Sequence, residues 1–600
     1  MPASRNLRVY SFDPGRAGRK QSAVTVRLPW EPLCPGPVGG RIAVIDYNIS
    51  RDCYYPAIDL DEDRFLADQG LQVDESNPQF HQQMVYAIAM ETVRRFETAL
   101  GRRVRWRRER SGFLKGFHAG KLRIFPHAFE EANAYYDPDL KALLFGYFKA
   151  TETSGLSTLP GQIVFTCLSQ DIVAHETTHA ILDGIREHFI EPTSFDTPAY
   201  HEALADIVAL FQHFSHADVL LDAIQRTRGQ IYQKVLTAIA TGSGEKTIQA
   251  LYDDDNPLIE LAKQFGEAMG SRKALRSALG TPADPAQLAV TTEAHDRGAI
   301  LVAAIFDAFF SVYVRRTQDL LRMTYPHGRL PEPGFLNADL ALRLAGEAAK
   351  TADRMLTICV RALDYCPPVD IQFGDYLRAI VTSDCDAAPN DDGGYRAALI
   401  DAFRARGIRP AGVRSYSEEA LRWETQDAEK ILATCPPSKR GDFRKLFMQQ
   451  LEIDHAQTDE ERQAKKKKFY KNLWGGAVTF QKALGLAPSP RPYIGSASLL
   501  QRMRPDGMFQ RLLVAELLQQ REEWVDPADH SLDKFTFRGG VTLVLTDDGS
   551  VKYSIGKRID DEDRLESQRN YLQRVMNGTA ARAYLDKAAT PSIRAIHRGY

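Results

Sequence analysis

Residues 171–185 read DIVAHETTHAILDGI, and the rest of the chain is best interpreted from this stretch. On a helix, His175 and His179 lie on one face because they are four residues apart, and Glu176 lies one step further round. Two imidazoles at this spacing can bind one metal ion, and the adjacent carboxylate can act as a base on water at the metal. The stretch therefore predicts a helix with two zinc ligands and a catalytic glutamate. A pair of surface histidines is the alternative for the motif by itself.

A second helical pattern, HEALADIVALF at residues 201–211, follows shortly after the first. Glu202 and Asp206 share one face of this helix. A catalytic zinc site needs three protein ligands and an open position, so Glu202 is the candidate for the third ligand. Asp206 can accept the free ring N–H of a ligating histidine, which fixes its tautomer. Taken alone, the segment could also be an ordinary solvated pair of acidic residues.

The HExxH motif followed by ExxxD on a second helix resembles the gluzincin metallopeptidases, and within them the thermolysin-like branch. The resemblance covers roughly residues 130–410. It implies an α+β catalytic unit with a strand-rich N-terminal half, a helical C-terminal half and the zinc cleft between them. It also implies one zinc ion per chain, held by His175, His179 and Glu202, and peptide-bond hydrolysis with Glu176 as general base.

Four shorter segments match the family's pattern in the expected order. EEANAYYDP resembles the edge strand that binds extended peptide backbone, which implies this role for Asn133 and Ala134. KALRSALG resembles the segment whose arginine contacts the substrate carbonyl, here Arg276, and EAHDRGAI resembles the segment with the transition-state-stabilising histidine, here His295. Residues 373–408 resemble the closing helices of the catalytic domain. A turn asparagine, a solvated arginine and a capping histidine are the structural alternatives.

The chain departs from the family's pattern at several positions. The family has a tyrosine between the two zinc motifs, whereas the tyrosine here, Tyr200, is too close to Glu202 to align, and His188 is a rival donor. Glu293 stands in for an aspartate that the family has before its stabilising histidine. The acidic clusters that hold structural calcium are mostly missing, although Asp171 matches one ligand position, so calcium dependence is not expected.

The composition is that of a globular protein, with 44% hydrophobic and 26% charged residues among 600. A net charge of -2 gives no global field toward nucleic acid or anionic lipid. Seven scattered cysteines without a CxxC pair predict reduced thiols rather than a disulfide framework. The basic N-terminal residues precede no apolar segment, and the apolar stretch at residues 299–312 is interrupted by Asp307. We therefore expect a cytoplasmic protein without a secretory signal or membrane span.

The pattern of elements predicts three regions in an α+β fold. Residues 1–155 form a strand-rich region with the substrate edge strand, and residues 156–412 form the helical zinc-binding region. Residues 413–600 form an accessory region that is mostly helical and ends in a β-hairpin, whose turn is at Asp548 and Gly549. In the first region a helix is expected at residues 77–100, and strands are expected at segments that include RRVRWRRER, KLRIFPHAF and ANAYYDPD.

The expected partner is a peptide or an unfolded protein, with no membrane and no nucleic acid; the oligomeric state stays open. Basic residues surround Trp106, and a lysine run at 465–468 precedes aromatic residues, a combination that can bind nucleic acid. A solvated strand and a helix with packed aromatic residues explain these segments better. Two other functions are open: an aminopeptidase, disfavoured because no GxMEN-type segment precedes the zinc motif, and a catalytically silent or gated peptide-binding protein, disfavoured because Glu176 is retained.

Overall fold

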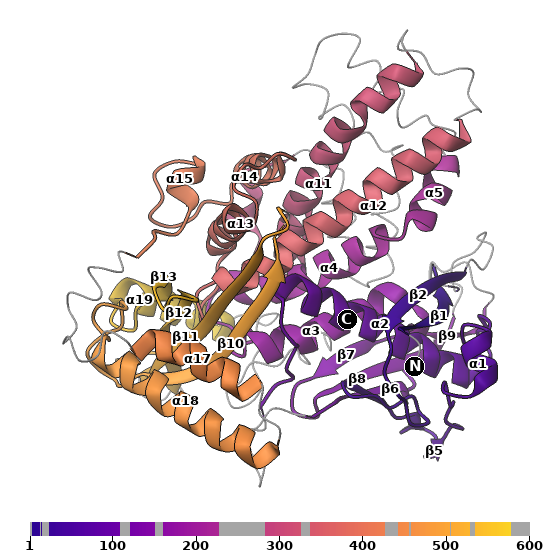
Figure 1. Cartoon of the computed structure of the whole chain (residues 1–600), viewed down its shortest axis with the longest axis horizontal. Coiled ribbons are helices and arrows are strands. Elements are labelled where there is room, and N and C mark those ends of the chain that lie inside the picture. The colour runs from indigo at the N-terminus through magenta and orange to yellow at the C-terminus, as the bar shows by residue number, and fades with distance from the viewer. Residues whose placement is uncertain are drawn as a thin grey trace.

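The structure is a computed structural model in which α-helices and β-sheets are mixed, as the sequence predicts (Figure 1). A five-stranded sheet in the N-terminal third carries helices on one face, a group of long helices follows, and a second sheet lies near the C-terminus. The residues that the structure describes are 3–11, 14, 23–108, 120–150, 160–226, 283–325, 337–426, 442–454, 458–504, 506–528 and 534–577.

The N-terminal sheet places an edge strand beside the predicted zinc helix. Strands β3 (Ile42–Val44), β6 (Leu122–Phe129) and β8 (Ala142–Lys149) run parallel. Strand β7 (Ala134–Asp137) pairs antiparallel with β8 and ends the order β3-β6-β8-β7, while β9 (Ile163–Phe165) pairs with the far end of β8. Strand β7 therefore lies at the edge of the described sheet, as expected for the segment ANAYYDPD.

The expected strand at RRVRWRRER is wrong for the part that the structure describes, because residues 103–107 have no regular secondary structure. Instead, two of their side chains hold this segment against other parts of the protein. The indole N–H of Trp106 donates to the carbonyl of Arg41 at 3.0 Å, and the buried guanidinium of Arg107 pairs with Asp183. The remaining small elements of this region are the pairs β1 (Ser4–Tyr10) with β2 (Ala23–Pro29) and β4 (Tyr47–Asn48) with β5 (Cys53–Tyr54), and the helix α1 (Asp63–Ala67).

Helix α2 (Pro78–Leu100) confirms the helix expected at residues 77–100. Its start is fixed by Asn77, whose side chain accepts from the backbone N–H of Gln79, and its end by Gly101, whose φ of 68° favours glycine. The helix packs against the N-terminal sheet and against the predicted zinc helix. It is therefore buried on most of its surface, and its polar residues must find partners inside the protein.

The helical region predicted from about residue 169 to 406 is confirmed for the residues of this range that the structure describes. In Figure 1 the long helices α11 and α12 extend away from the N-terminal sheet, and α4 packs against both of them and against α3. The elements are η1 (Thr166–Leu168), α3 (Gln170–Ile185), α4 (Asp196–Phe214), α5 (Ala217–Arg226), α10 (Gln287–Val290), α11 (Ala294–Thr324), α12 (Ala338–Arg361), η2 (Ala362–Tyr365), α13 (Phe373–Ala387), α14 (Tyr395–Ala405) and α15 (Glu418–Leu421).

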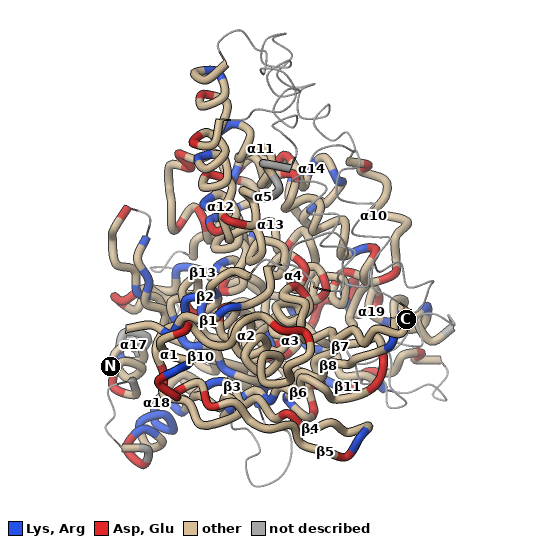
Figure 2. Tube along the Cα trace, turned by 90° about the vertical axis from the view of Figure 1, so that its right-hand side faces the viewer, with Lys and Arg blue, Asp and Glu red and all other residues tan. Residues whose placement is uncertain are grey.

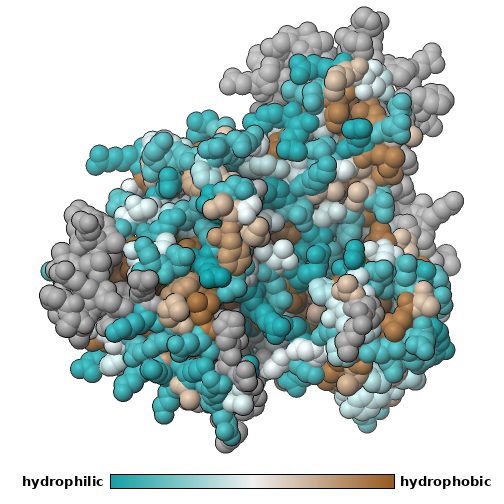
Figure 3. Space-filling model, viewed as in Figure 1, coloured by the Kyte–Doolittle hydropathy of each residue, from teal (hydrophilic) through white to brown (hydrophobic). Residues whose placement is uncertain are grey.

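Among the described helices, α11 is the one that is long and apolar enough to cross a membrane by length and composition, with a mean hydropathy of 1.7 over its most apolar window. Most of that window, 83%, is buried inside the protein, and the core helix of a protein in water has the same composition. The face of the molecule in Figure 3 is largely hydrophilic, with hydrophobic residues in small separate patches.

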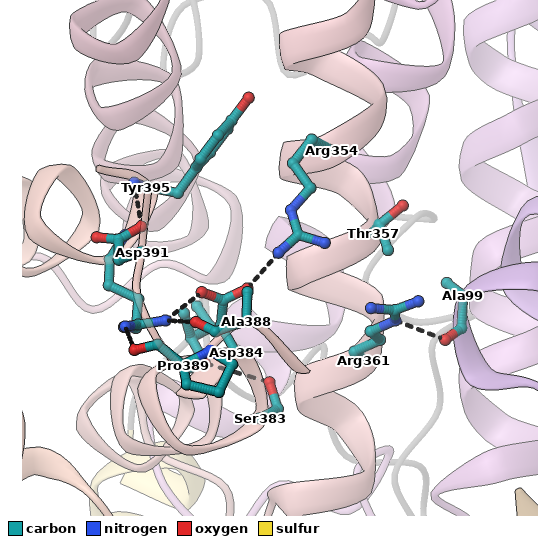
Figure 4. Close-up of polar contacts among 12 residues, drawn as sticks. Ala99, Arg354, Thr357, Arg361, Ser383, Asp384, Ala388, Pro389, Asp391 and Tyr395 are labelled. Carbon is teal, nitrogen blue, oxygen red and sulfur yellow. Dashed lines mark hydrogen bonds and ion pairs between the residues drawn. The ribbon is translucent and has the colours of Figure 1, made fainter. Parts of the chain in front are cut away.

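A buried network of charged side chains ties α12, α13 and α14 together (Figure 4). The Asp384 carboxylate accepts from Arg354 at 2.8 Å and from Arg396 at 2.9 Å. Arg396 also donates to the carbonyls of Ala388 and Pro389 in the turn between α13 and α14. Because these buried groups satisfy one another, the two helices predicted at residues 373–408 are held in a fixed arrangement.

The C-terminal region contains a sheet that the sequence analysis did not predict. Strands β10 (Tyr493–Met503), β11 (Phe509–Trp524), β12 (Lys534–Thr546) and β13 (Val551–Lys557) are antiparallel and lie in that order. The predicted hairpin is β12–β13, with its turn at Asp548 and Gly549, and it is confirmed. However, the region does not end there, because α19 (Glu562–Asn577) follows.

This C-terminal sheet is buried on both faces. Along β11, Leu512 and Val514 face the main hydrophobic core of the molecule. Leu513 and Leu517 lie on the opposite face of the strand and pack in a separate core. Helices α17 (Asp442–Asp454) and α18 (Asp459–Thr479) cover that second core. A strand buried on both faces reads as a continuous apolar run, which resembles a buried helix in sequence, and this explains why the sheet was missed.

The lysine run at 465–468 lies on α18, where basic residues are conspicuous in Figure 2. Phe469 directly after the run is fully buried in the core beneath the helix, and Lys467 and Lys468 are exposed. Lys465 pairs with Glu461 one turn earlier. The segment therefore has the structure expected of a helix with packed aromatic residues and solvated lysines.

Candidate metal centre

The two predicted zinc motifs converge in the protein interior. Helix α3 supplies His175 and His179, and α4 supplies Glu202; their ligand atoms all lie within 4.8 Å of one another. The Nε2 atoms of the two histidines are 2.9 Å apart, and Glu202 Oε2 lies 3.4 Å from one and 3.6 Å from the other. Ligands of a tetrahedral zinc ion at ~2.0–2.1 Å are about 3.3 Å apart. The two distances to Glu202 are close to this value, and the two imidazole nitrogens lie closer together, so the three side chains form a group that could hold a metal ion.

The outer ring nitrogens of both histidines have partners that orient the rings. Asp206, one turn after Glu202, contacts Nδ1 of His175 through its Oδ1 at 2.9 Å. The Nδ1 atom of His179 lies 2.7 Å from Nδ1 of His201. With Nδ1 engaged outward, each ring directs Nε2 toward the common centre, as ligating histidines do. The structure thus brings Asp206 to the position predicted for it.

His201 has a place in this arrangement that sequence reasoning missed. Its ring stacks on that of His179, with centroids 4.8 Å apart, and it is fully buried. The available signal was its position directly before Glu202, but adjacent residues on a helix do not normally face the same side. Only the packing of α4 against α3 brings the ring to His179.

Glu176 lies beside the centre and contacts the edge strand of the sheet. Its Oε2 accepts from the backbone N–H of Tyr136, in β7, at 2.8 Å. The Tyr136 hydroxyl donates to Asp183 near the C-terminal end of α3 at 2.8 Å. Strand β7 is therefore attached to α3 at two points, and Ala134 is part of this strand while Asn133 directly precedes it.

His295 reaches the centre from α11, 93 positions after Glu202 in the sequence. Its Nε2 lies 3.5 Å from Glu202 Oε2, and its Nδ1 lies 3.1 Å from Glu293 Oε1. Glu293 also caps α11 by accepting from the N–H of Asp296 at 2.7 Å. Glu293 is therefore in contact with the histidine that it was expected to orient.

Other residues from the sequence analysis lie elsewhere. Arg276 is outside the described residues. The ring of Tyr200 packs in the core against Phe189 and Tyr376, and His188 pairs with Glu191 at 2.9 Å, so none of these contacts involves His295. The calcium-position residue Asp171 contacts Nδ1 of His213 at 2.8 Å.

Burial and neighbouring charges shift the protonation of the centre. Burial raises the pKa of Glu176 to about 8, with His175 opposing the shift and Glu202 adding to it. Burial alone would lower the pKa of His295, but the carboxylates of Glu202 and Glu293 raise it to about 9. Burial would raise the pKa of Glu202, and the surrounding imidazoles instead lower it well below its ordinary value.

No protein-family model matches the sequence, and no curated protein matches it. The likeness to gluzincins therefore depends on residues of this chain alone: the zinc motifs on α3 and α4, the edge strand β7 and the histidine on α11.

Proposed function

We propose that this protein is a zinc-dependent peptidase of the gluzincin type, with a thermolysin-like catalytic unit that cleaves extended peptides internally. The observation that carries the proposal is the convergence of His175, His179 and Glu202 within 4.8 Å, with Glu176 beside them. Two imidazoles and one carboxylate form a donor set typical of catalytic zinc, because three protein ligands leave one position open. A purely structural zinc ion would not need the additional carboxylate.

Zinc bound at this centre would supply an activated water molecule and polarise the scissile carbonyl. Glu176 would take the proton of that water at its carboxylate and deliver it to the leaving amine. The backbone N–H of Tyr136 engages Oε2 of Glu176, so Oε1 is the oxygen in the better position to take the proton. This hydrogen bond holds the carboxylate in one orientation.

His295 and the edge strand would position the substrate around the centre. Nε2 of His295, 3.5 Å from Glu202 Oε2, is within reach of a carbonyl oxygen bound at the open position, where it would donate to the developing oxyanion. An extended peptide would pair with the outer edge of β7 at Asn133 and Ala134, where it would displace the Asn133 side chain that accepts from the backbone N–H of Ala134 at 2.8 Å. Such a pairing selects unfolded segments. Strand β7 contacts Glu176, so this pairing would bring the peptide to the catalytic base.

Zinc content and peptide cleavage test the proposal together. The wild-type protein is compared with Glu202→Ala and with Glu419→Ala, a matched control on the exposed helix α15. Glu202→Ala should lose about one zinc ion per chain relative to wild type, and cleavage of a quenched peptide library should fall by at least ~100-fold. Glu419→Ala should match the wild type, and a chelator should abolish cleavage.

Peptides with acetylated N-termini separate internal cleavage from aminopeptidase activity. The proposal requires that acetylated peptides are cut at internal bonds. Cleavage limited to free N-termini would identify an aminopeptidase and contradict the internal specificity. Zinc binding without any cleavage would indicate the non-catalytic peptide binder, and equal zinc contents in Glu202→Ala and wild type would refute the metal centre.

A further inference from the structure

A second group of potential metal ligands lies outside the catalytic centre. His81 comes from α2, His127 from β6 and Cys167 from η1, and one ligand atom of each lies within 4.8 Å of the others. All three side chains are buried, with exposures of 1%, 1% and 0%. No sequence motif connects them, since they are far apart in the chain and are brought together only by folding.

The hydrogen bonds around the two rings define which nitrogens carry protons. Nε2 of His81 lies 2.9 Å from the carbonyl oxygen of Glu75, which can only accept, so this nitrogen donates. Nδ1 of His127 lies 2.7 Å from the carboxylate of Asp46 and donates to it. In neutral rings the other nitrogens, His81 Nδ1 and His127 Nε2, then carry lone pairs. These two atoms lie 2.8 Å apart.

Two facing lone pairs repel each other unless a proton or a metal ion lies between them. A proton would make one ring an imidazolium in the protein interior. A metal ion would satisfy both lone pairs at once.

The geometry repeats that of the candidate catalytic centre. There, two imidazole nitrogens face each other at 2.9 Å, and an aspartate engages the outer nitrogen of His175. Here the nitrogens are 2.8 Å apart, and Asp46 engages the outer nitrogen of His127. Asp46 is itself held by the side-chain amide of Gln82 at 2.8 Å. A carboxylate behind a histidine is the usual support of a metal ligand.

We propose that His81 Nδ1, His127 Nε2 and Cys167 Sγ bind a second metal ion, which their donor chemistry identifies as zinc. Imidazole and thiolate are the donors that zinc prefers, whereas calcium and magnesium require oxygen. The thiol of Cys167 loses its proton to solvent when the metal binds. This inference does not depend on the proposed peptidase function.

The second metal would stabilise the start of the catalytic helix. Cys167 lies in η1, which leads directly into α3, and Ser169 between them caps that helix. The metal would join η1 to α2 and β6. The ring of Phe165 packs on both histidines, with centroids 4.6 Å and 5.5 Å away, and shields the group from water.

Cobalt(II) is a suitable probe because thiolate ligation gives it a charge-transfer absorption in the near ultraviolet, and the catalytic centre has no thiolate ligand. The full-length protein is stripped of metal, titrated with cobalt and compared with Cys167→Ser, with Cys359→Ser, a buried cysteine elsewhere in the core, and with Glu202→Ala. The wild type should bind about two cobalt ions and show the thiolate band.

The variants assign the two ions to their sites. Cys167→Ser should lose the thiolate band and about one cobalt ion, whereas Glu202→Ala should lose about one ion and keep the band. Cys359→Ser should behave as the wild type. His81→Gln should also lose the band, which provides a second test if Cys167→Ser does not fold.

Three outcomes would overturn the second site. These are a wild-type protein without the thiolate band, a band that persists in Cys167→Ser, and a band that disappears in Cys359→Ser. Failure of peptide cleavage with the band intact would refute only the proposed function, so the two proposals fail separately.

Discussion

At the level of single side chains, the two oxygens of Glu176 have different surroundings. Oε2 is fixed by the backbone N–H of Tyr136 at 2.8 Å, while the carboxylate as a whole lies beside three potential metal ligands. In the proposed function its role is therefore proton transfer rather than holding the metal. Substitution by an amide of the same shape separates these two roles.

We predict that Glu176→Gln binds zinc as the wild type does and loses turnover by ~10²–10⁴-fold or more, because an amide cannot take a proton from water. The glutamine oxygen can still accept from Tyr136, so the local geometry is kept. Zinc content and kcat are the measurements, and Glu419→Gln on exposed α15 is the control. Loss of zinc from Glu176→Gln would contradict the role assigned to this residue.

A second prediction concerns acid sensitivity and the buried carboxylate of Glu91. Burial would raise its pKa, but His216 and Arg95, at 3.5 Å and 2.9 Å, lower it from 4.5 to about 2. The unfolded chain then binds the proton more readily between these values, so stability falls as pH decreases from about 4.5 toward 2, by ~3 kcal/mol in total. Urea unfolding at a series of pH values measures this.

Glu91→Gln is the comparison for that measurement. The variant cannot take up the proton, so its stability should depend less on pH below 4.5 than that of the wild type. Parallel pH profiles of the two proteins would show that Glu91 is not the group responsible.

At the level of helices, the centre depends on how closely α11 approaches α4. Gly298, three residues after His295, lies where an added Cβ would be 2.8 Å from the carbonyl oxygen of Ala199. Since α11 carries His295 and α4 carries Glu202, any separation of these helices also separates the two side chains. The small residue therefore allows the close approach that sets the distance between His295 and Glu202.

We predict that Gly298→Ala destabilises the protein by about 1–3 kcal/mol through overpacking and reduces kcat. The control is Gly346→Ala in α12, where no atom lies within 4 Å of the added Cβ. There alanine should stabilise by up to ~1 kcal/mol, because it is the better helix former. Thermal unfolding and peptide cleavage are the measurements. If the Tm shifted in the same direction in Gly298→Ala and Gly346→Ala, the close approach of α11 to α4 would not be the cause of the destabilisation.

At the level of the whole molecule, the C-terminal sheet is part of the main core. Leu512, Val514 and Tyr553 pack in the same cluster as residues of α3, α4 and α11. The buried guanidinium of Arg186, at the end of α3, pairs with Glu516 of β11 and donates to Thr542 of β12 at 3.1 Å. Removing this region would expose core and leave Arg186 without its carboxylate partner, so point substitutions test its role better than truncation.

We predict that Glu516→Ala destabilises the protein by ~3–5 kcal/mol, because it leaves the charge of Arg186 buried without its partner. Glu522→Ala, on the exposed part of the same strand, should change stability by less than about 0.5 kcal/mol. Denaturant unfolding of both variants measures the difference. Equal stability of the two would mean that the ion pair does not hold the sheet to α3.

Several features were determined by the sequence alone because they depend on local spacing. His175 and His179 share a face of α3 because a helix repeats every 3.6 residues, and Asn77 and Gly101 set the ends of α2 through capping. The turn at Asp548 and Gly549 likewise determined the last hairpin. Each of these signals is contained within a few residues of the chain.

Tertiary structure alone decided which distant residues meet. The approach of His295 to Glu202, the stacking of His201 on His179 and the grouping of His81, His127 and Cys167 have no periodic signature in the sequence. They arise because burial of apolar surface packs α2, α3, α4, α11 and the sheets against one another, and this packing fixes side chains that are far apart along the chain. Local spacing specifies an element and its faces, whereas long-range packing specifies the site.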